Sequence, residues 1–213
     1  MTKFVRVIRS STSAAMGQYF PARAAYLLLC ALPLPVAAQT LGSMDLDDKL
    51  QYHVQRTYRP TSILSYAASA GYQQLRNTPN EWGQGGDAYG HRLASVAGYA
   101  AIHNGLALGL DSALHQDPRY FRSTGSGLWR RTGHALRMTI LTRTDSGGET
   151  FSTWRVGSAY GSAYLANQWY PDRLNNTRQV FQRGSIRLGF DFVSNLAIEF
   201  WPDLKARFKH KKP

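Results

Sequence analysis

Three polar residues in one long apolar stretch of the sequence have the side chains needed for acid–base or metal chemistry. Asp111 and His115 are four residues apart, so they share a face of a helix, and His103 precedes Asp111 by about two turns. Imidazole and carboxylate groups can transfer protons or bind a metal ion, which makes His103, Asp111 and His115 the candidate catalytic residues. The alternative for each histidine is a hydrogen bond inside a polar core. Since no HExxH, GxSxG or paired-cysteine motif occurs, we predict neither a metal site nor a cofactor.

Arginines crowd the segment that follows, residues 117–155, and leave it with a net charge of +4. No lysine occurs between Lys49 and Lys205. A guanidinium binds a carboxylate or phosphate through two parallel hydrogen bonds, which an ammonium cannot do. We favour the interpretation that the arginines staple loops, that is, hold them in place through ion pairs with acids of the same chain. The alternatives are that they converge on an external anionic group, or that a codon bias toward arginine accounts for their number. The candidate anion-binding residues are Arg119, Arg122, Arg130, Arg131 and Arg137.

The loop "HQDPRYFRSTGSGLWRR", residues 115–131, carries several of these arginines. We interpret it as a structural clasp rather than a catalytic site. Asp117 and Pro118 are residues that turn a chain, and Tyr120 can pack the loop against the core. Two glycines further along, Gly157 and Gly161, are four residues apart in a helix rich in small side chains. This spacing lets neighbouring helices approach closely, either within a membrane or in a tightly packed bundle.

The elements that must position these residues are helices. The pattern predicts helices over residues 61–77, 88–114, 128–142 and 176–200, with a further helix in residues 151–171 and Pro202 closing the last. Residues 93–110 carry no charge, which meets the lower length limit of a membrane span, but His103 and Asn104 lie in the middle. We predict an all-α, compact bundle of about five helices around a buried, small-residue-rich central helix, with a membrane-seated bundle as the alternative.

The first forty residues differ from the rest. Four basic residues, an apolar run from Ala24 to Ala38 and small residues before Gln39 predict a cleaved signal peptide over residues 1–38; an uncleaved anchor is the alternative. Loss of these four bases lowers the net charge from +12 to +8. Residues 39–59 are polar and predict a flexible linker, residues 60–208 a single helical domain, and residues 209–213 a basic tail. The one cysteine, Cys30, lies within the signal peptide.

Charge and aromatic placement favour a membrane surface or an anionic envelope polymer as partner, and not nucleic acid. The excess positive charge belongs to an exported chain, where lipid head groups are the common anions. The tryptophans lie near the ends of the predicted helices, as in interfacial belts. The sequence identifies no protein partner.

Four motifs together resemble an uncharacterised family of predicted bacterial envelope proteins. They are "LHQDPRYFR", "LTRTDSGGETF", "NQWYPDR" and "FDFVSNLAIEFWPDLKARF", in this order, within residues 82–208. The resemblance implies export to the periplasm or outer membrane of a Gram-negative-type bacterium, and it implies no activity. We therefore expect a membrane-associated, non-enzymatic envelope protein with a binding or structural role. The alternatives are an envelope hydrolase that acts on lipid or cell wall through a His/Asp centre, and a small membrane protein of a transport assembly.

Overall fold

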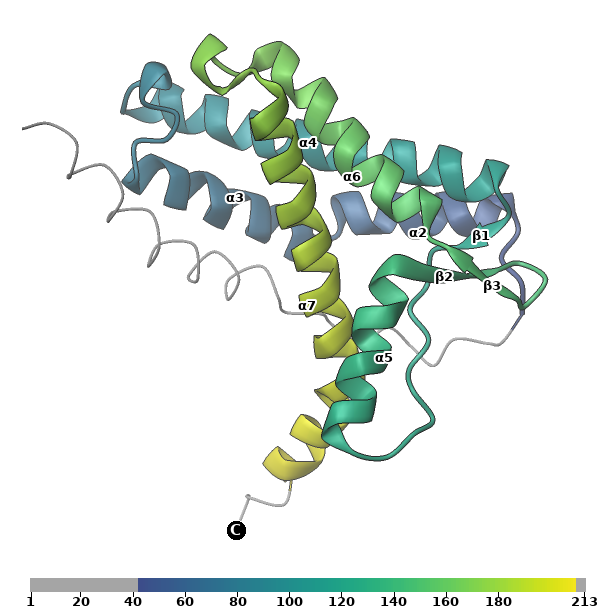
Figure 1. Cartoon of the computed structure of the whole chain (residues 1–213). Coiled ribbons are helices and arrows are strands. Elements are labelled where there is room, and N and C mark those ends of the chain that lie inside the picture. The colour runs from purple at the N-terminus through teal and green to yellow at the C-terminus, as the bar shows by residue number, and fades with distance from the viewer. Residues whose placement is uncertain (1–41, 210–213) are drawn as a thin grey trace, which may run out of the picture.

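The computed structural model describes residues 42–209, with side chains as far as Ala206. Within this range the chain forms six α-helices, three short 3-10 turns and one small sheet (Figure 1). The helices are α2 (Leu46–Tyr58), α3 (Pro60–Leu75), α4 (Gly86–Ala113), α5 (Leu128–Ile140), α6 (Thr153–Ala166) and α7 (Thr177–Lys209). The all-α helical bundle is confirmed. The predicted signal peptide and residues 210–213 of the predicted tail lie outside the described range.

Helix α4 is the centre of the bundle and packs against α2, α3 and α6. Helices α2 and α3 follow one another along α4, and α7 crosses this layer and continues beyond it with α5 at its side (Figure 1). A small apolar cluster lies between α5 and α7, where Tyr120, Ala135 and Met138 contact Phe192 and Leu196. The rest of the interior is unusually polar, as described below.

Helix α2 corrects the prediction of a flexible linker over residues 39–59. Its first turn is capped by Asp45, whose carboxylate accepts a hydrogen bond from the amide of Asp48 at 2.8 Å. The side chains that α2 buries are Lys49, His53 and Thr57, one per turn. A buried helix face is recognised in a sequence by apolar residues at helical spacing, and these three residues are polar. The polar composition of the segment therefore led to the wrong prediction of a linker.

Helix α7 continues past Pro202 to Lys209, so the predicted helix end at this proline is wrong. A proline removes one intrahelical hydrogen bond but does not by itself end a helix. Here Arg131 of α5 pairs with Glu199 at 2.9 Å on one side of Pro202 and with Asp203 on the other. The guanidinium thus contacts α7 on both sides of the proline.

A small antiparallel sheet, also missed by the helical pattern, joins the loop after α4 to the α5–α6 connection. Its strands are β1 (Gln116–Asp117), β2 (Leu141–Thr144) and β3 (Glu149–Phe151), in the order β1-β2-β3. In the strand register, Arg143 of β2 lies opposite Asp117 of β1 and opposite Glu149 of β3. Strands of two to four residues are too short to show an alternating pattern in a sequence.

Gly184 lies where α7 crosses α6, and we expect it to tolerate no side chain. A Cβ at this position would approach the ring of Tyr160 to 2.3 Å, whereas a Cβ at Gly189 on the same helix would meet nothing within 4 Å. We predict that Gly184→Ala lowers the free energy of unfolding by about 1–3 kcal/mol through overpacking. Gly189→Ala should instead raise it by up to about 1 kcal/mol through helix propensity. Urea denaturation measures both; equal effects would contradict the close approach.

Candidate functional site

The three predicted catalytic residues do not converge. His103 and Asp111 are buried, but their separation of two helical turns corresponds to about 12 Å along α4. The side chain of His115 is 84% exposed, and its Nδ1 lies 3.9 Å from Asp145 Oδ2. The structure therefore does not bring His103, Asp111 and His115 together in one centre. Within residues 42–209, no group of three or more His, Cys, Asp or Glu residues is placed to hold a metal ion.

Asp111 instead pairs with His53 of α2, a residue in the segment misread as a linker. His53 Nε2 lies 2.6 Å from Asp111 Oδ2, and both side chains are buried. Burial raises the pKa of the Asp111 carboxyl, and this effect exceeds the opposing effect of the bond to His53. Lys49 Nζ completes the network: it donates to the Asp111 carbonyl oxygen and pairs with Asp145 at 2.7 Å. The only sequence signal was the four-residue spacing of Lys49, His53 and Thr57.

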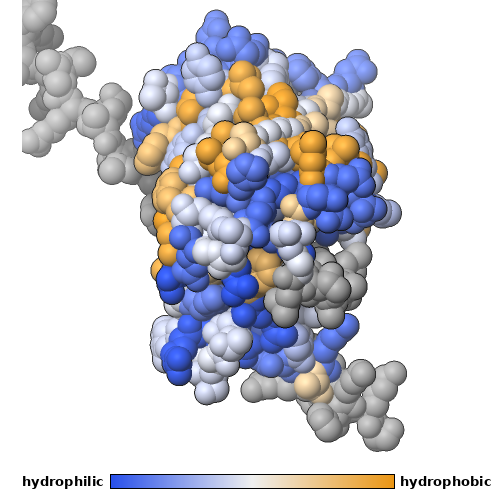
Figure 2. Space-filling model, turned by 90° about the vertical axis from the view of Figure 1, so that its right-hand side faces the viewer, coloured by the Kyte–Doolittle hydropathy of each residue, from blue (hydrophilic) through white to orange (hydrophobic). Residues whose placement is uncertain are grey.

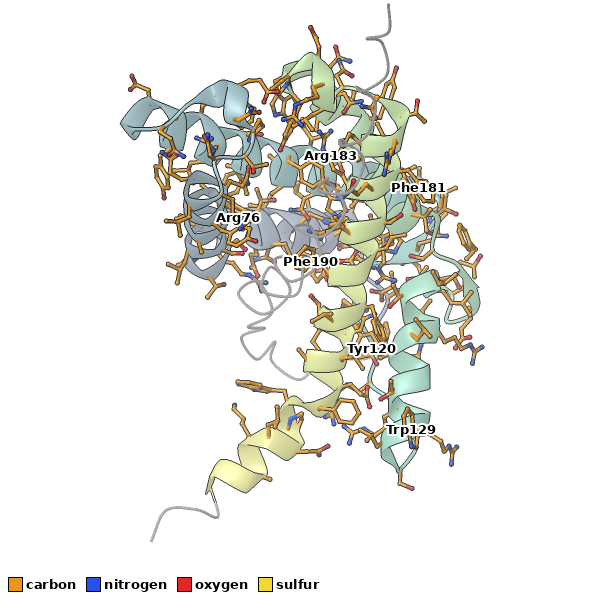
Figure 3. The ribbon with its side chains drawn as sticks, turned by 60° about the vertical axis from the view of Figure 1, so that its left-hand side comes forward. Arg76, Tyr120, Trp129, Phe181, Arg183 and Phe190 are labelled. Atoms are coloured by element: carbon orange, nitrogen blue, oxygen red, sulfur yellow. The ribbon has the colours of Figure 1, made fainter. Side chains whose placement is uncertain are left out.

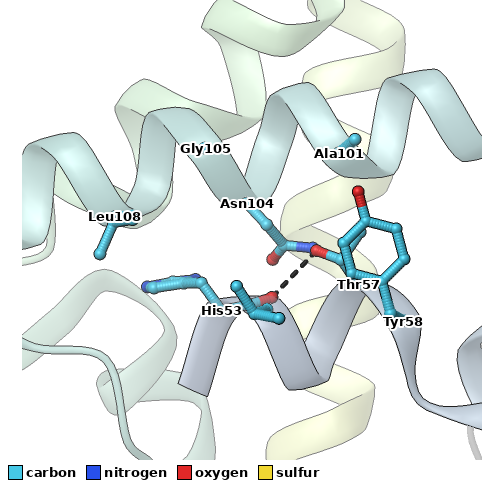
Figure 4. A pocket seen from close by; sticks show the side chains of 8 residues that line it. His53, Thr57, Tyr58, Ala101, Asn104, Gly105 and Leu108 are labelled. Atoms are coloured by element: carbon cyan, nitrogen blue, oxygen red, sulfur yellow. Dashed lines mark hydrogen bonds between the residues drawn. The ribbon is translucent and has the colours of Figure 1, made fainter. Parts of the chain in front are cut away.

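A pocket of about 150 Å³ lies between α2 and α4, next to this pair (Figure 4). Polar side chains contribute to one part of its lining: Asn104 Nδ2 donates to Thr57 Oγ1 at 2.9 Å, and Thr57 Oγ1 donates to the carbonyl oxygen of His53. Its other lining residues are Val54, Tyr58, Ala101, Gly105 and Leu108. The pocket thus combines largely apolar walls with a few polar groups, as small-molecule sites do.

A second buried network surrounds Asp191, where α7 crosses the other helices. Arg187 donates to Asp191 at 3.3 Å, Arg56 lies 3.8 Å from the same carboxylate, and Arg155 adds positive charge. Burial alone would raise the pKa of Asp191, but the three guanidinium groups outweigh burial and hold this pKa below its ordinary value. Burial, with the charge of Arg187, lowers the pKa of nearby His103 well below its ordinary range, so this imidazole is neutral.

Three of the five candidate anion-binding arginines are paired with acids. Arg119 forms a forked bond to Asp117, with its closest contact at 2.6 Å, and Arg131 pairs with Glu199. The third, Arg137, pairs with Glu149. These contacts fit the stapling interpretation. For Arg122 and Arg130, both exposed, the described residues show no ion pair, so only these two keep their guanidinium groups available to an external anion.

The residues of the predicted clasp lie at the junction of the loop, the sheet and α7. Asp117 is buried and accepts from the backbone and side chain of Arg119, while its own carbonyl accepts from Thr142. The carbonyl of Pro118, which is fully buried, accepts from Tyr52. Tyr120, which Figure 3 shows beside α7, donates its hydroxyl to Glu199 at 2.8 Å. Burial together with this bond raises the pKa of the phenol.

The two glycines of α6 face α4. A Cβ at Gly157 would lie 2.8 Å from Leu110 Cδ1, and one at Gly161 would lie 3.1 Å from Leu106 Cδ1. The helices therefore approach closely here, as the small-residue spacing requires.

No protein-family model, no curated protein and no solved structure matches this chain. The resemblance to a family of envelope proteins therefore stays a prediction.

Proposed function

We propose that this chain is a membrane-associated, non-enzymatic helical protein of the bacterial cell envelope, with a binding or structural role. The observation that carries the proposal is the inverted distribution of polarity in α2. Its side facing the bundle buries Lys49, His53 and Thr57. Beside this buried row, exposed apolar residues form a stripe with one residue per turn, from Leu46, 67% exposed, to Tyr58, 66% exposed; the stripe consists of Leu46, Leu50, Val54 and Tyr58.

In a water-soluble amphipathic helix the apolar stripe faces the core, whereas the apolar stripe of α2 is exposed. Single exposed apolar residues are common on soluble proteins, but a continuous stripe indicates contact with lipid or with another protein. Figure 2 shows that large apolar residues gather in the upper half of one exposed face, above a mainly hydrophilic part. Contact between the α2 stripe and lipid would remove Leu46, Leu50, Val54 and Tyr58 from water.

Helix α4 adds support. Among the described helices, it is the one whose length and hydropathy suffice to cross a membrane, and only 22% of its most apolar window is buried in the protein. A core helix of a soluble protein would be mostly buried. Because α2 exposes Asp47 and Asp48 next to the apolar stripe, we propose that this face lies against the membrane and does not cross it.

The exposed arginines supply the electrostatic part of the proposal. At the start of α5, Trp129 is 84% exposed and is followed by exposed Arg130; Arg122 lies in the preceding loop. An amphipathic indole next to guanidinium groups suits the head-group region of an anionic bilayer. A non-enzymatic role is preferred because the predicted catalytic residues do not converge.

The apolar part is tested by fractionating cells that express the full chain. We expect wild-type protein in the membrane fraction after a high-salt wash, and Leu50→Gln/Val54→Gln protein in the soluble fraction. The two half-exposed side chains contribute roughly 3 kcal/mol of apolar burial, about a 100-fold change in partitioning. Gln51→Ala/Gln55→Ala, on exposed positions of the same helix, is the control. N-terminal sequencing must find Gln39, so that an uncleaved anchor does not hold the variants in the membrane.

The electrostatic part is tested with phosphatidylglycerol vesicles. Arg122→Gln/Arg130→Gln should weaken binding about 30-fold at low salt, since each basic side chain near an anionic surface contributes about 1 kcal/mol. The matched control is Arg76→Gln/Arg178→Gln, which also removes two exposed arginines; Figure 3 places Arg76 far from Trp129. Soluble wild-type protein, or equal losses in the two double variants, would contradict the proposal.

A further inference from the structure

The pocket between α2 and α4 is an open hollow that continues the exposed apolar stripe of α2. Val54 and Tyr58 belong to the stripe and also line the hollow. Ala101 and Gly105, two exposed residues of α4, line it from the other side. Figure 4 shows Tyr58 and Leu108 at its two ends, with Gly105 between them. The hollow is thus part of the surface that is proposed to contact the membrane.

The hollow runs along α4. Its lining residues on this helix extend from Ala101 to Leu108, which is about two turns or roughly 10 Å. Its volume of about 150 Å³ is that of a cavity that holds one benzene ring. Because residue 105 is a glycine, no side chain fills the hollow at this position, and a Cβ there would meet nothing within 4 Å. These dimensions suit a stretch of hydrocarbon chain better than a fused ring system.

The walls of the hollow are mainly apolar, because its polar side chains form hydrogen bonds within the protein. His53 Nε2 lies 2.6 Å from Asp111 Oδ2, and Asn104 Nδ2 donates to Thr57 Oγ1. Thr57 in turn donates to the carbonyl oxygen of His53. The three polar lining residues, His53, Thr57 and Asn104, are all buried. A ligand therefore gains affinity here by burying hydrocarbon, and not through hydrogen bonds.

Contact between the stripe and a bilayer would turn the hollow toward lipid. The apolar face of an interfacial helix lies about 5–10 Å deep, at the boundary between head groups and acyl chains. A void at this depth would cost the lining atoms their dispersion contacts, and a lipid chain that enters it restores them. Tyr58 is 66% exposed at one end of the hollow, so its ring can contact a chain while its hydroxyl remains among the head groups.

We infer that the hollow holds a segment of one acyl chain of a membrane lipid, between Val54 and Tyr58 of α2 and Ala101 and Gly105 of α4. This inference rests on the proposed membrane contact, which supplies the chain. The bound chain attaches the protein to a single lipid molecule, in addition to the general contact of the stripe with the bilayer.

The test uses the full chain in solution with dodecylphosphocholine as the probe, below the concentration at which this amphiphile forms micelles. Each probe molecule then offers one alkyl chain, and no membrane is needed. We expect isothermal titration to find one tightly bound probe molecule per protein. The ¹³C methyl resonances of Val54, Ala101 and Leu108 should shift on binding, whereas those of Leu46, about two turns from Val54 on the same stripe, should not.

A variant that fills the hollow separates this site from the rest of the stripe. In a helix a leucine side chain leans toward the preceding turn, so Gly105→Leu places it over Ala101, within the hollow. It should weaken probe binding about 50-fold, because it displaces about three methylenes and each methylene returned to water lowers the affinity about fourfold. Gly90→Leu is the matched control, since Gly90 is equally exposed and open on α4 but does not line the hollow. Urea denaturation should show that both variants fold.

Three results would overturn the inference. In the first, the wild-type chain binds no probe. In the second, Gly105→Leu and Gly90→Leu bind the probe equally well, so that the chain lies elsewhere. In the third, the methyl resonances of Leu46 shift and those of Val54 and Leu108 do not, so that only the stripe binds.

Failure of this inference and failure of the proposed function are distinguishable. Gly105→Leu leaves the stripe intact, so it should stay in the membrane fraction in the fractionation assay whatever its affinity for the probe. A wild-type chain that binds the probe but is soluble in that assay would refute the membrane contact and not the site in the hollow.

Discussion

Asp191→Asn is expected to lower the free energy of unfolding by about 3 kcal/mol. Asparagine has the shape of aspartate but no charge. The change leaves Arg187, Arg56 and Arg155 near one another without their shared carboxylate. Breaking a fully buried pair costs up to about 5 kcal/mol, and the lower figure applies here because Arg187 and Arg56 keep some contact with water.

Urea denaturation at neutral pH measures this effect. Asp172→Asn, at an exposed aspartate, is the control and should change stability by less than about 0.5 kcal/mol. If repulsion among the arginines causes the loss, then Asp191→Asn combined with Arg187→Gln should be more stable than the sum of the two single effects. Additive effects would show that Asp191 acts through packing and would refute the electrostatic explanation.

Glu199→Gln is expected to lower the free energy of unfolding by a similar amount, about 3 kcal/mol, at neutral pH. Glu199 is fully buried, and its carboxylate accepts from Arg131, the backbone amide of Ser123 and the hydroxyl of Tyr120. Asp203→Asn is the matched control because Asp203 pairs with the same Arg131 but is 53% exposed. Exposed pairs contribute less than about 1 kcal/mol, so the control should be nearly neutral.

The pH dependence of stability provides a second readout for Glu199. Burial would raise the pKa of Glu199, but the bonds from Arg131, Ser123 and Tyr120 outweigh it, and the folded-state pKa lies below the ordinary value of 4.5. A depressed pKa stabilises the folded state above the ordinary value, and this contribution is lost as the pH falls through the folded-state value. The wild-type chain should therefore lose stability below about pH 4.5, and Glu199→Gln should lose less over the same range. An identical acid slope in both proteins would show that Glu199 is not the titrating group.

The helices that were predicted correctly are those whose signals are local. Helix α3 begins at a proline and ends before Pro79, and the long uncharged stretch of α4 lies between Arg92 and Asp111. Such signals depend on residues within one or two turns, so they can be read along the chain. Helix α2 also has a helical spacing, but the residues that follow it, Lys49, His53 and Thr57, are polar. They can be recognised as buried residues only when the helix that they contact is known.

The candidate site was the least predictable part. Asp111 was identified as a polar residue able to do chemistry, but its partner His53 lies 58 positions earlier. In the same way, Arg131 was a candidate for binding an external anion, and the acid with which it pairs, Glu199, lies 68 positions later. A sequence shows which side chains can form strong pairs, while the choice of partner depends on how distant helices cross.

By itself, the sequence determined the helical class, the crowding of arginines, and the polar residues placed within apolar helices, because each of these depends on composition and short-range spacing. The packing of the helices, in contrast, turns Lys49, His53 and Thr57 of α2 inward and pairs three of the five candidate anion-binding arginines with acids of the same chain. The physical reason is that burying a charge is costly unless it is paired, and pairing depends on distances that only the packed helices define.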